Sequence, residues 1–353
     1  MICVAWGGIP SYAACALSRF VKDSSEPVRV IATPSDVPRT CYETIGGEKI
    51  NWIRDNDRKS FEDIIGEVPR VFVVSGWFIP SFNHLVKQMR DKKRPVVALC
   101  DNRLKMGIRL FAWLPYFYTL IRPRFNAFMT PGRSGYRLLR LGGVQPERIG
   151  MSLYTADPLV FRGDVPLQRR GKRMVFVGRY DSRKNIIPFT RAFLESKLAD
   201  NGWKLDCYGQ GELEGQLRSL ASVSGGAVGV HRFKQPNDLA REYASARVAV
   251  LPSLEDHWGV VVHEAALCGC ALLLSSEVGA AEDLYSRKNG RVFSPVRNDC
   301  MIKALKDLDE WSDEEWAAAF EESQRQASMI SPENFSKNLS GLITQLEHDL
   351  DAK

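Results

Sequence analysis

Two carboxylates, Asp256 and Glu264, lie eight positions apart in the segment PSLEDHWGVVVHEAALCG (252–269). We expect a helix to begin near Val260, where the free N–H groups of its first turn would face an anion such as a diphosphate. The two acceptor oxygens of Glu264 match the vicinal hydroxyls of a ribose, and Asp256, in the loop before the helix, would hold hydroxyls of a sugar. The alternative from local propensity is a β-branched strand with a carboxylate at each end.

Two cations follow a different apolar run, VFVGRYDSRKN (175–185). This strand is expected to end at Gly178 and to deliver Arg179, with Lys184 five residues later. Cations at a strand end can offset the charge that grows on a phosphate leaving group. The alternative is a solvated loop, which is the more common location of Arg and Lys.

Glycines follow two further strand-like runs. Gly7 and Gly8 stand in CVAWGGIPSY (3–12), and Gly209 and Gly211 in LDCYGQGELEG (205–215). A backbone without Cβ atoms can approach a ligand closely, but a plain tight turn requires the same residues. The first pair does not form G-x-G-x-x-G, so a standard dinucleotide site is disfavoured.

The elements that must position these residues alternate between apolar strands and helical segments, which favours an α/β fold with helices on both faces of a parallel sheet. Ligands bind such sheets at the carboxyl ends of the strands. A polar run with Gly and Pro, 162–173, reads as a linker. We therefore predict two Rossmann-like domains, 1–163 and 164–330, and a C-terminal helix, 331–353, that packs back on the first. The expected strands are 1–8, 28–33, 71–75, 95–100, 174–178, 204–209, 247–252 and 271–276.

The net charge of +6 is unevenly distributed along the 353 residues. Residues 1–163 hold 24 Lys and Arg against 14 Asp and Glu, whereas residues 164–353 hold 24 against 28. The excess lies mostly in 87–148, with 14 basic and 3 acidic residues around the apolar run FAWLPYFYTLI (111–121). Such a surface suits a nucleic acid, an anionic membrane or an anionic substrate. The sequence shows no helix-turn-helix, zinc or RNP signature, so we do not expect nucleic acid as a partner.

The apolar runs, the N-terminal segment and the cysteines indicate the cellular compartment of the protein. No apolar run approaches the roughly 18 to 20 residues that span a bilayer, and no export signal is visible at the N-terminus. The eight cysteines form no C-x-x-C pair and read as buried thiols. We expect a cytoplasmic protein, peripheral at the inner face of the membrane through 87–148. Asp55–Asn56–Asp57 matches the metal-binding D-x-D pattern, but it follows a short run and is interpreted as a loop, so no metal is expected.

The segments VGRYDSRKN, GQGELEG, PSLEDHWGVVVHEAALCG and GAAEDL…NGRVF resemble, in order and spacing, the retaining glycosyltransferases of the two-Rossmann (GT-B) type, family 4. The resemblance implies two domains facing across a cleft and metal-independent transfer of a sugar from a nucleotide diphosphate sugar with retention at the anomeric carbon. It places the donor on the second domain and a glycan or lipid-linked glycan acceptor on the first. Synthesis of a cell-surface polysaccharide or glycolipid is the implied role, with no cofactor.

Carried over by motif, Arg179 and Lys184 bind the diphosphate, Glu264 binds the ribose and Asp256 contacts the donor sugar. Asp256 departs from the family, in which Glu is usual at this position. The first domain also lacks the family's His after a mid-domain strand, and Asp101 stands roughly in its place, as a candidate catalytic residue. The remaining donor-binding candidates are Gly7, Gly8, Gly178, Gly209, Gly211, Gly259, Val260 and Val261.

Several alternatives stay open. An epimerase or hydrolase of nucleotide sugars would use the same scaffold, whereas a non-enzymatic protein binding an anionic surface would leave the strand-end residues without a role. The run 108–121 is either a membrane-facing surface or a core helix with solvated flanking charges. The loop 231–238 is a candidate base pocket, although Phe233 fits equally well in the core.

Overall fold

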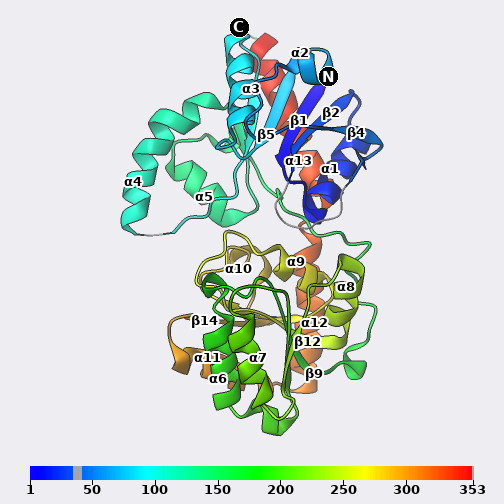
Figure 1. Ribbon diagram of the computed structural model, residues 1–353, viewed down its shortest axis with the longest axis vertical. Coiled ribbons are helices and arrows are strands. Elements are labelled where there is room, and N and C mark those ends of the chain that lie inside the picture. The colour runs from blue at the N-terminus through cyan, green and yellow to red at the C-terminus, as the bar shows by residue number, and fades with distance from the viewer. Residues whose placement is uncertain (35–41, 106, 352–353) are drawn as a thin grey trace. The chain divides into compact units, whose positions relative to one another are not determined.

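The computed structural model describes residues 1–34, 42–105 and 107–351. It divides into two compact units, one formed by Met1–Ala156 with Ile330–Lys353 and the other by Asp157–Met329 (Figure 1). The division falls earlier than the predicted boundary after residue 163, because Phe161 is buried with its ring centroid 6.3 Å from that of Tyr243. The predicted linker is therefore partly structured, and a strand of the second unit begins at Gly171.

The first unit contains an eight-stranded sheet in the order β3-β4-β2-β1-β5-β6-β7-β8. Its neighbouring strands are parallel except β3 and β4, which are antiparallel. Two buried clusters, one on each face, form the core. The strands are β1 (Ile2–Gly7), β2 (Val28–Thr33), β3 (Thr44–Ile45), β4 (Glu48–Trp52), β5 (Val71–Ser75), β6 (Val96–Leu99), β7 (Ala127–Met129) and β8 (Ile149–Gly150).

Helices cover both faces of this sheet. The C-terminal helix α13 (Pro332–Asp351) lies beside α1 (Ser11–Asp23), and both contribute to one buried cluster (Figure 1). The C-terminal helix thus packs within the first unit. The opposite face is covered by α2 (Phe61–Ile65), α3 (Pro80–Asp91), the π-helix η1 (Phe117–Ile121) and α5 (Arg133–Leu141), with α4 (Ile108–Tyr116) leading into η1.

The second unit contains a six-stranded parallel sheet in the order β11-β10-β9-β12-β13-β14. Its strands are β9 (Gly171–Val177), β10 (Lys204–Tyr208), β11 (Val228–His231), β12 (Ala246–Leu251), β13 (Ala271–Ser275) and β14 (Gly290–Phe293). Its helices are α6 (Ile186–Glu195), α7 (Glu214–Ser222), α8 (Pro236–Ser245), α9 (Val260–Leu267), α10 (Ala281–Leu284), α11 (Asn298–Asp309) and α12 (Asp313–Ser328). In Figure 1, α6, α7 and α11 lie on one side of this sheet, and α8, α9 and α12 on the other.

All eight predicted strands are present, and both units are of the predicted Rossmann-like class. The three valines 260–262 begin a helix, so the alternative of a strand there is wrong. Asp55–Asn56–Asp57 lies in a turn after β4, as expected. Cys15 and Cys300 are only half-buried, unlike the other described cysteines, and Cys41 lies outside the described residues.

Candidate functional site

The strand order of the second unit reverses between β9 and β12. The chain proceeds from β9 outward to β10 and β11, and then returns to place β12 on the other side of β9. A crevice outside the carboxyl ends of the strands forms at such a switch point and is where α/β sheets bind ligands. The loops that leave β9 and β12 carry Lys184 and Asp256, so these predicted residues flank the switch point.

The backbone around Lys184 is held at several points. The Asp181 carboxylate accepts a hydrogen bond from the Lys184 N–H at 2.9 Å and caps a short 3-10 turn. Asn185 has a left-handed backbone, with φ of 56°, and its buried amide donates to the carbonyl of Pro295 at 2.9 Å. The Leu254 N–H donates to the carbonyl of Arg183 at 2.8 Å, which joins the loop after β9 to the loop after β12. The lysine is therefore presented from a fixed turn.

Lys184 Nζ forms an ion pair with Asp256 Oδ2, and their side chains are only 13% and 11% exposed. Ser253 Oγ donates to the same carboxylate oxygen at 3.4 Å. The Asp256 N–H donates to the carbonyl of Glu277 at 3.0 Å, which fixes the loop against the segment after β13. Ser253 and Glu277 were not predicted from the sequence, although Ser253 directly follows the proline at the end of β12. A diphosphate entering here meets a lysine whose charge is already balanced by a carboxylate.

Arg179 has a different environment. Its side chain is 73% exposed, and its Nε lies 3.6 Å from Asp181 Oδ2. The structure therefore brings Lys184 and Asp256 together and leaves Arg179 at the surface of the same loop. An exposed guanidinium can turn toward an anionic ligand at little energetic cost.

The first turn of α9 offers unused donors. Gly259 precedes it with φ of 89°, a conformation that favours glycine. Val262 N–H donates to the Gly259 carbonyl at 2.9 Å, whereas within the described residues the N–H groups of Gly259, Val260 and Val261 have no protein acceptor. These donors, together with the helix dipole, suit a phosphate.

Glu264, one turn further along α9, is 9% exposed, and burial raises the pKa of its carboxyl to about 7. Its side chain accepts no hydrogen bond from any described residue. The buried indole Nε1 of Trp258 likewise has no partner in the described part of the chain. A buried polar group without a partner is costly, so the Trp258 indole N–H would be stabilised by a ligand that supplies a hydrogen-bond acceptor. The Glu264 carboxyl can accept hydrogen bonds from a ligand's hydroxyls.

The glycines after β9 and β10 pack against each other. A Cβ atom on Gly209 would lie 1.9 Å from the carbonyl oxygen of Gly178, and one on Gly211 would lie 2.5 Å from that of Tyr180. The Tyr180 hydroxyl also donates to the carbonyls of Cys207 and His231, at 2.7 and 2.9 Å. Backbone packing between adjacent turns therefore accounts for Gly209 and Gly211, which favours the turn interpretation over close approach to a ligand.

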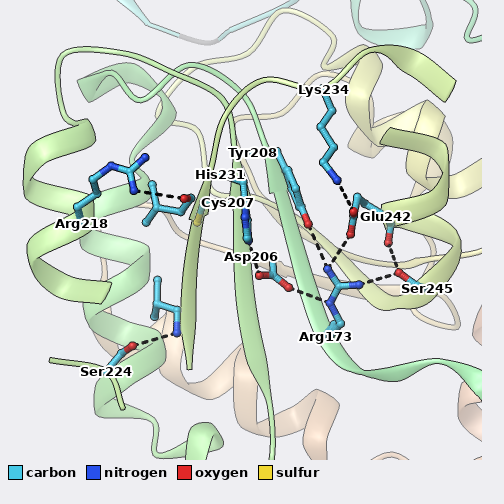
Figure 2. Close-up of polar contacts among 12 residues, drawn as sticks. Arg173, Asp206, Cys207, Tyr208, Arg218, Ser224, His231, Lys234, Glu242 and Ser245 are labelled. Atoms are coloured by element: carbon cyan, nitrogen blue, oxygen red, sulfur yellow. Dashed lines mark hydrogen bonds and ion pairs between the residues drawn. The ribbon is translucent and has the colours of Figure 1, made fainter. Parts of the chain in front are cut away.

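Figure 2 shows a charged network beside α8 on the same sheet. Arg173 Nε donates to Asp206 at 2.8 Å, and its Nη2 donates to Glu242 at 2.9 Å. Burial alone would raise the pKa of Glu242, but hydrogen bonds from Lys234 and Arg173 lower it to about 2. His231 Nε2 lies 2.8 Å from Asp206, so the network fixes both ends of the 231–234 loop.

The predicted base-pocket loop 231–238 begins at this network. The ring of His231 stacks on that of Tyr208, with centroids 4.6 Å apart. Phe233 is 56% exposed, so the alternative that it belongs to the core is wrong. An exposed aromatic ring on a loop with fixed ends is available to a planar base.

The first unit also has a switch point, between β1 and β5, but its glycine N–H groups are already used. Gly7 N–H donates to Ser75 Oγ at 3.0 Å, and Gly8 N–H donates to the carbonyl of Thr33 at 3.0 Å. Each of these two N–H groups has a protein acceptor, which favours the alternative of a plain tight turn at Gly7 and Gly8. Gly8 adopts φ of 53°, which explains the glycine as a turn residue.

Asp101 follows β6 at the carboxyl edge of the same sheet and is half-buried. Its Oδ2 accepts a hydrogen bond from the Tyr154 hydroxyl at 3.1 Å. Burial raises the pKa of Tyr154, with further contributions from Tyr12 and Asp101, and the Tyr12 and Tyr154 rings meet edge to face at 4.8 Å. The carboxylate is thus oriented by a neutral phenol that remains a donor at physiological pH.

Two features are absent from the described residues. No group of three His, Cys, Asp or Glu side chains in that part of the chain is arranged to hold a metal ion. Across the same residues, no helix combines the length and apolar content that crossing a bilayer requires.

Residues 171–310 match the protein family described as Glycosyl transferases group 1. A curated relative, an uncharacterized glycosyltransferase of Methanocaldococcus jannaschii, is 28% identical over 177 residues. That match covers 49% of this chain and 45% of the relative, so it spans about half of each protein.

Solved structures match nearly the whole chain. The Anabaena protein HepE in complex with UDP has a TM-score of 0.74 at 12% identity, covering 98% of this chain and 99% of that chain. A trehalose-6-phosphate synthase, studied as an enzyme of glycosyl transfer with retention, has a TM-score of 0.75 at 12% identity, with coverage of 98% and 99%. At such identities the likeness shows the fold, and that fold is GT-B.

Proposed function

We propose that this chain, a GT-B protein whose residues 171–310 match the group 1 glycosyltransferases, transfers a sugar from a nucleotide diphosphate sugar to a hydroxyl of an acceptor. In this reaction the bond from the anomeric carbon to the β-phosphate oxygen breaks and a bond to the acceptor oxygen forms. The acceptor's hydroxyl proton is released as the nucleoside diphosphate leaves. The proposed stereochemistry is retention, as in the trehalose-6-phosphate synthase named above.

The observation that carries the proposal is the set of groups around the β9–β12 switch point. The Lys184–Asp256 pair, the unused N–H groups at the start of α9 and the unpartnered carboxyl of Glu264 all belong to the loops and helix that follow these strands. Together they offer a cation and N–H donors for a diphosphate, and an acceptor for ribose hydroxyls.

The residues have distinct proposed roles. Lys184 and Arg179 offset the negative charge that develops on the departing diphosphate, and the α9 donors hold it. Asp256 accepts hydrogen bonds from the transferred sugar once the diphosphate competes for Lys184. Since these groups supply the stabilisation that a divalent ion gives in other transferases, we propose a metal-independent reaction.

The acceptor is proposed to bind the first unit, near Asp101 and the loop after β1. That unit carries the basic excess of 87–148, so an anionic or lipid-linked glycan is the proposed acceptor class. The corresponding biological role is synthesis of a cell-surface polysaccharide or glycolipid on the cytoplasmic side of the membrane.

The test begins with nucleotide binding. Thermal unfolding of the full chain with UDP, GDP and ADP should show stabilisation by one of them, by about 2.7 kcal/mol at 100 times its dissociation constant. Incubation of the corresponding nucleotide sugars with and without acceptor extracts then separates transfer from epimerisation and hydrolysis. Product NMR gives the anomeric configuration. Turnover without acceptor, or loss of activity in EDTA that Mg²⁺ restores, would contradict the proposal.

A further inference from the structure

The segment α4–η1 (108–121) has an unusual distribution of apolar residues. Leu110, Phe117 and Ile121 are buried and anchor it to the core of the first unit. The opposite side is also apolar, with Ile108 88% exposed and Phe111 73% exposed. A surface helix of a globular protein normally presents polar residues to water, so an apolar outer face points to a further contact. We call this outer face the apolar patch: Ile108, Phe111, Tyr116, Tyr118 and Leu120.

The patch lies on a packed element. The rings of Trp113 and Phe117 stack at 4.4 Å, and Phe117 also contacts Phe128, whose centroid is 5.5 Å away. A Cβ atom on Gly142 would lie 2.6 Å from the Phe117 ring, so α5 closes tightly against the segment. The exposed side chains therefore project from a firmly seated segment.

The stretch of sequence that carries the patch has charges of one sign. Residues 102–146 contain eight Lys and Arg and no Asp or Glu. The Arg122 guanidinium lies 5.0 Å from the centroid of the Tyr118 ring, which belongs to the patch. Burial lowers the pKa of Arg124, and the nearby charge of Arg90 on α3 lowers it further, so cations from two elements meet here. Apolar side chains surrounded by cations match a layer of anionic headgroups above hydrocarbon.

A cavity of about 390 Å³ adjoins the patch through Arg122. Its lining also includes Asn126, Gln145 and Arg148, and the buried Nη1 atom of Arg148 has no partner among the described residues. Arg148 Nη2 forms an ion pair with Asp349 of α13, so the cavity offers an anionic headgroup the Arg122 guanidinium, the unpartnered Nη1 of Arg148 and two amides. The cavity lies before β7 and β8, at the amino ends of these strands, and so is distinct from the carboxyl edge that carries Asp101.

We propose that the apolar patch and its surrounding cations dock the protein on an anionic lipid bilayer. Aromatic and aliphatic side chains of the patch enter the headgroup region, while Arg122, Arg124 and α3 contact lipid phosphates. A protein partner or a second copy of this chain is disfavoured, because such an interface would need a matching acidic apolar surface. The docking goes beyond the proposed sugar transfer and does not depend on it.

The test is co-sedimentation of the full chain with vesicles of phosphatidylcholine alone or with 30% phosphatidylglycerol. We expect binding to the anionic vesicles in low salt and at least tenfold weaker binding in 0.5 M salt. The double variant Ile108→Ser, Phe111→Ser should bind at least tenfold more weakly. Its matched control, Val223→Ser with Val296→Ser, removes two equally exposed apolar side chains from the second unit and should bind normally.

A charge variant tests the electrostatic part. Lys87→Glu with Arg90→Glu changes exposed residues of α3, whereas Arg94 is avoided because it donates to the carbonyl of Pro69. Its control is Arg287→Glu with Lys288→Glu in the second unit, which makes the same change in net charge. Only the α3 variant should lose binding.

Absence of binding to anionic vesicles in low salt would overturn the proposal. Equal binding to neutral vesicles would do so as well, as would dimerisation abolished by the Ile108 and Phe111 substitutions. No donor or acceptor enters this assay, and nucleotide binding by each variant is measured separately. Failure of docking is therefore distinguishable from failure of the proposed transferase activity.

Discussion

Replacing Glu264 with Gln should remove a loss of stability that the free protein suffers as the pH rises to 7, and should weaken the binding of a nucleotide. The carboxyl is buried in α9 without a hydrogen-bond partner among the described residues, and burial raises its pKa to about 7. In the free protein its ionised form is therefore destabilising. In the proposed complex the same ionised form accepts hydrogen bonds from the ribose. A residue that exists for binding is expected to show this conflict, whereas a structural residue is not.

The stability effect follows from linkage. The folded protein holds the Glu264 proton more tightly than the unfolded chain, because the pKa rises from 4.5 to about 7 on folding. Its contribution is fully present below pH 4.5 and is lost as the pH rises through about 7. A shift of this size corresponds to about 3 kcal/mol. Glu264→Gln cannot ionise, so its unfolding free energy should lack this fall between pH 4.5 and pH 7.

The binding effect has the opposite sign. Wild-type affinity for UDP should rise between pH 6 and pH 8 as the carboxylate forms, whereas the variant should lack this rise. At pH 8 the variant should bind UDP more weakly by about 1.5 to 3 kcal/mol, the usual contribution of hydrogen bonds to a charged group. Titration of the nucleotide's own phosphate is common to both proteins and cancels in the comparison.

Two assays measure these effects. Denaturant unfolding at several pH values gives the stability, with the transition of the second unit identified as the one that UDP shifts. Calorimetry gives the UDP affinity. The control is Glu212→Gln, which neutralises an exposed carboxylate of the same unit and should leave both pH profiles unchanged. Parallel unfolding profiles for wild type and Glu264→Gln, together with equal UDP affinities, would refute the reasoning.

Two other predictions concern the diphosphate and sugar sites. Lys184→Ala and Arg179→Ala should each lower turnover more than tenfold in a fully folded protein, because each removes a charge aimed at the leaving group, whereas Arg183→Ala on the same turn should not. Asp256→Asn should lower turnover at least tenfold but leave UDP affinity equal or higher, because it releases Lys184 from its ion pair. Steady-state kinetics and calorimetry check both, and an Asp256→Asn protein that loses UDP binding would contradict the assigned role.

The fold was predictable where apolar runs are long. Strands such as β5 and β13 are four to five buried residues bounded by turn signals, and the sequence alone locates them. Strands β3 and β8 have two residues each, too few to show a period, so only their pairing with neighbours defines them. Local propensity favours a strand for the three valines of α9, but tertiary packing overrides it and they form a helix.

The sequence was sufficient to predict which residues belong to the site, but not which of them contact one another. Lys184 and Asp256 were each expected near a phosphate or sugar, but their ion pair joins positions 72 residues apart. No local pattern reports such a pair, because it depends on β9 and β12 becoming neighbours in the sheet. The outer face of 108–121 was ambiguous for a related reason: a run that is apolar on all sides does not indicate which side is buried.

The reason for a glycine also cannot be predicted from the sequence alone, and a substitution of Gly209 tests the reason that the structure gives. The sequence indicates that a residue with a Cβ atom does not fit at position 209, but it does not indicate whether a ligand or the protein itself excludes that atom. With φ of 159° and a Cβ position 1.9 Å from the Gly178 carbonyl oxygen, Gly209→Ala should destabilise the second unit by about 1 to 3 kcal/mol or more. Gly215→Ala, in the first turn of α7 with open space around its Cβ, is the matched control and should be neutral or slightly stabilising. UDP affinity of the folded fraction should be unchanged in both variants. If Gly209→Ala instead keeps its stability and loses UDP binding, the glycine serves the ligand and the packing explanation is wrong.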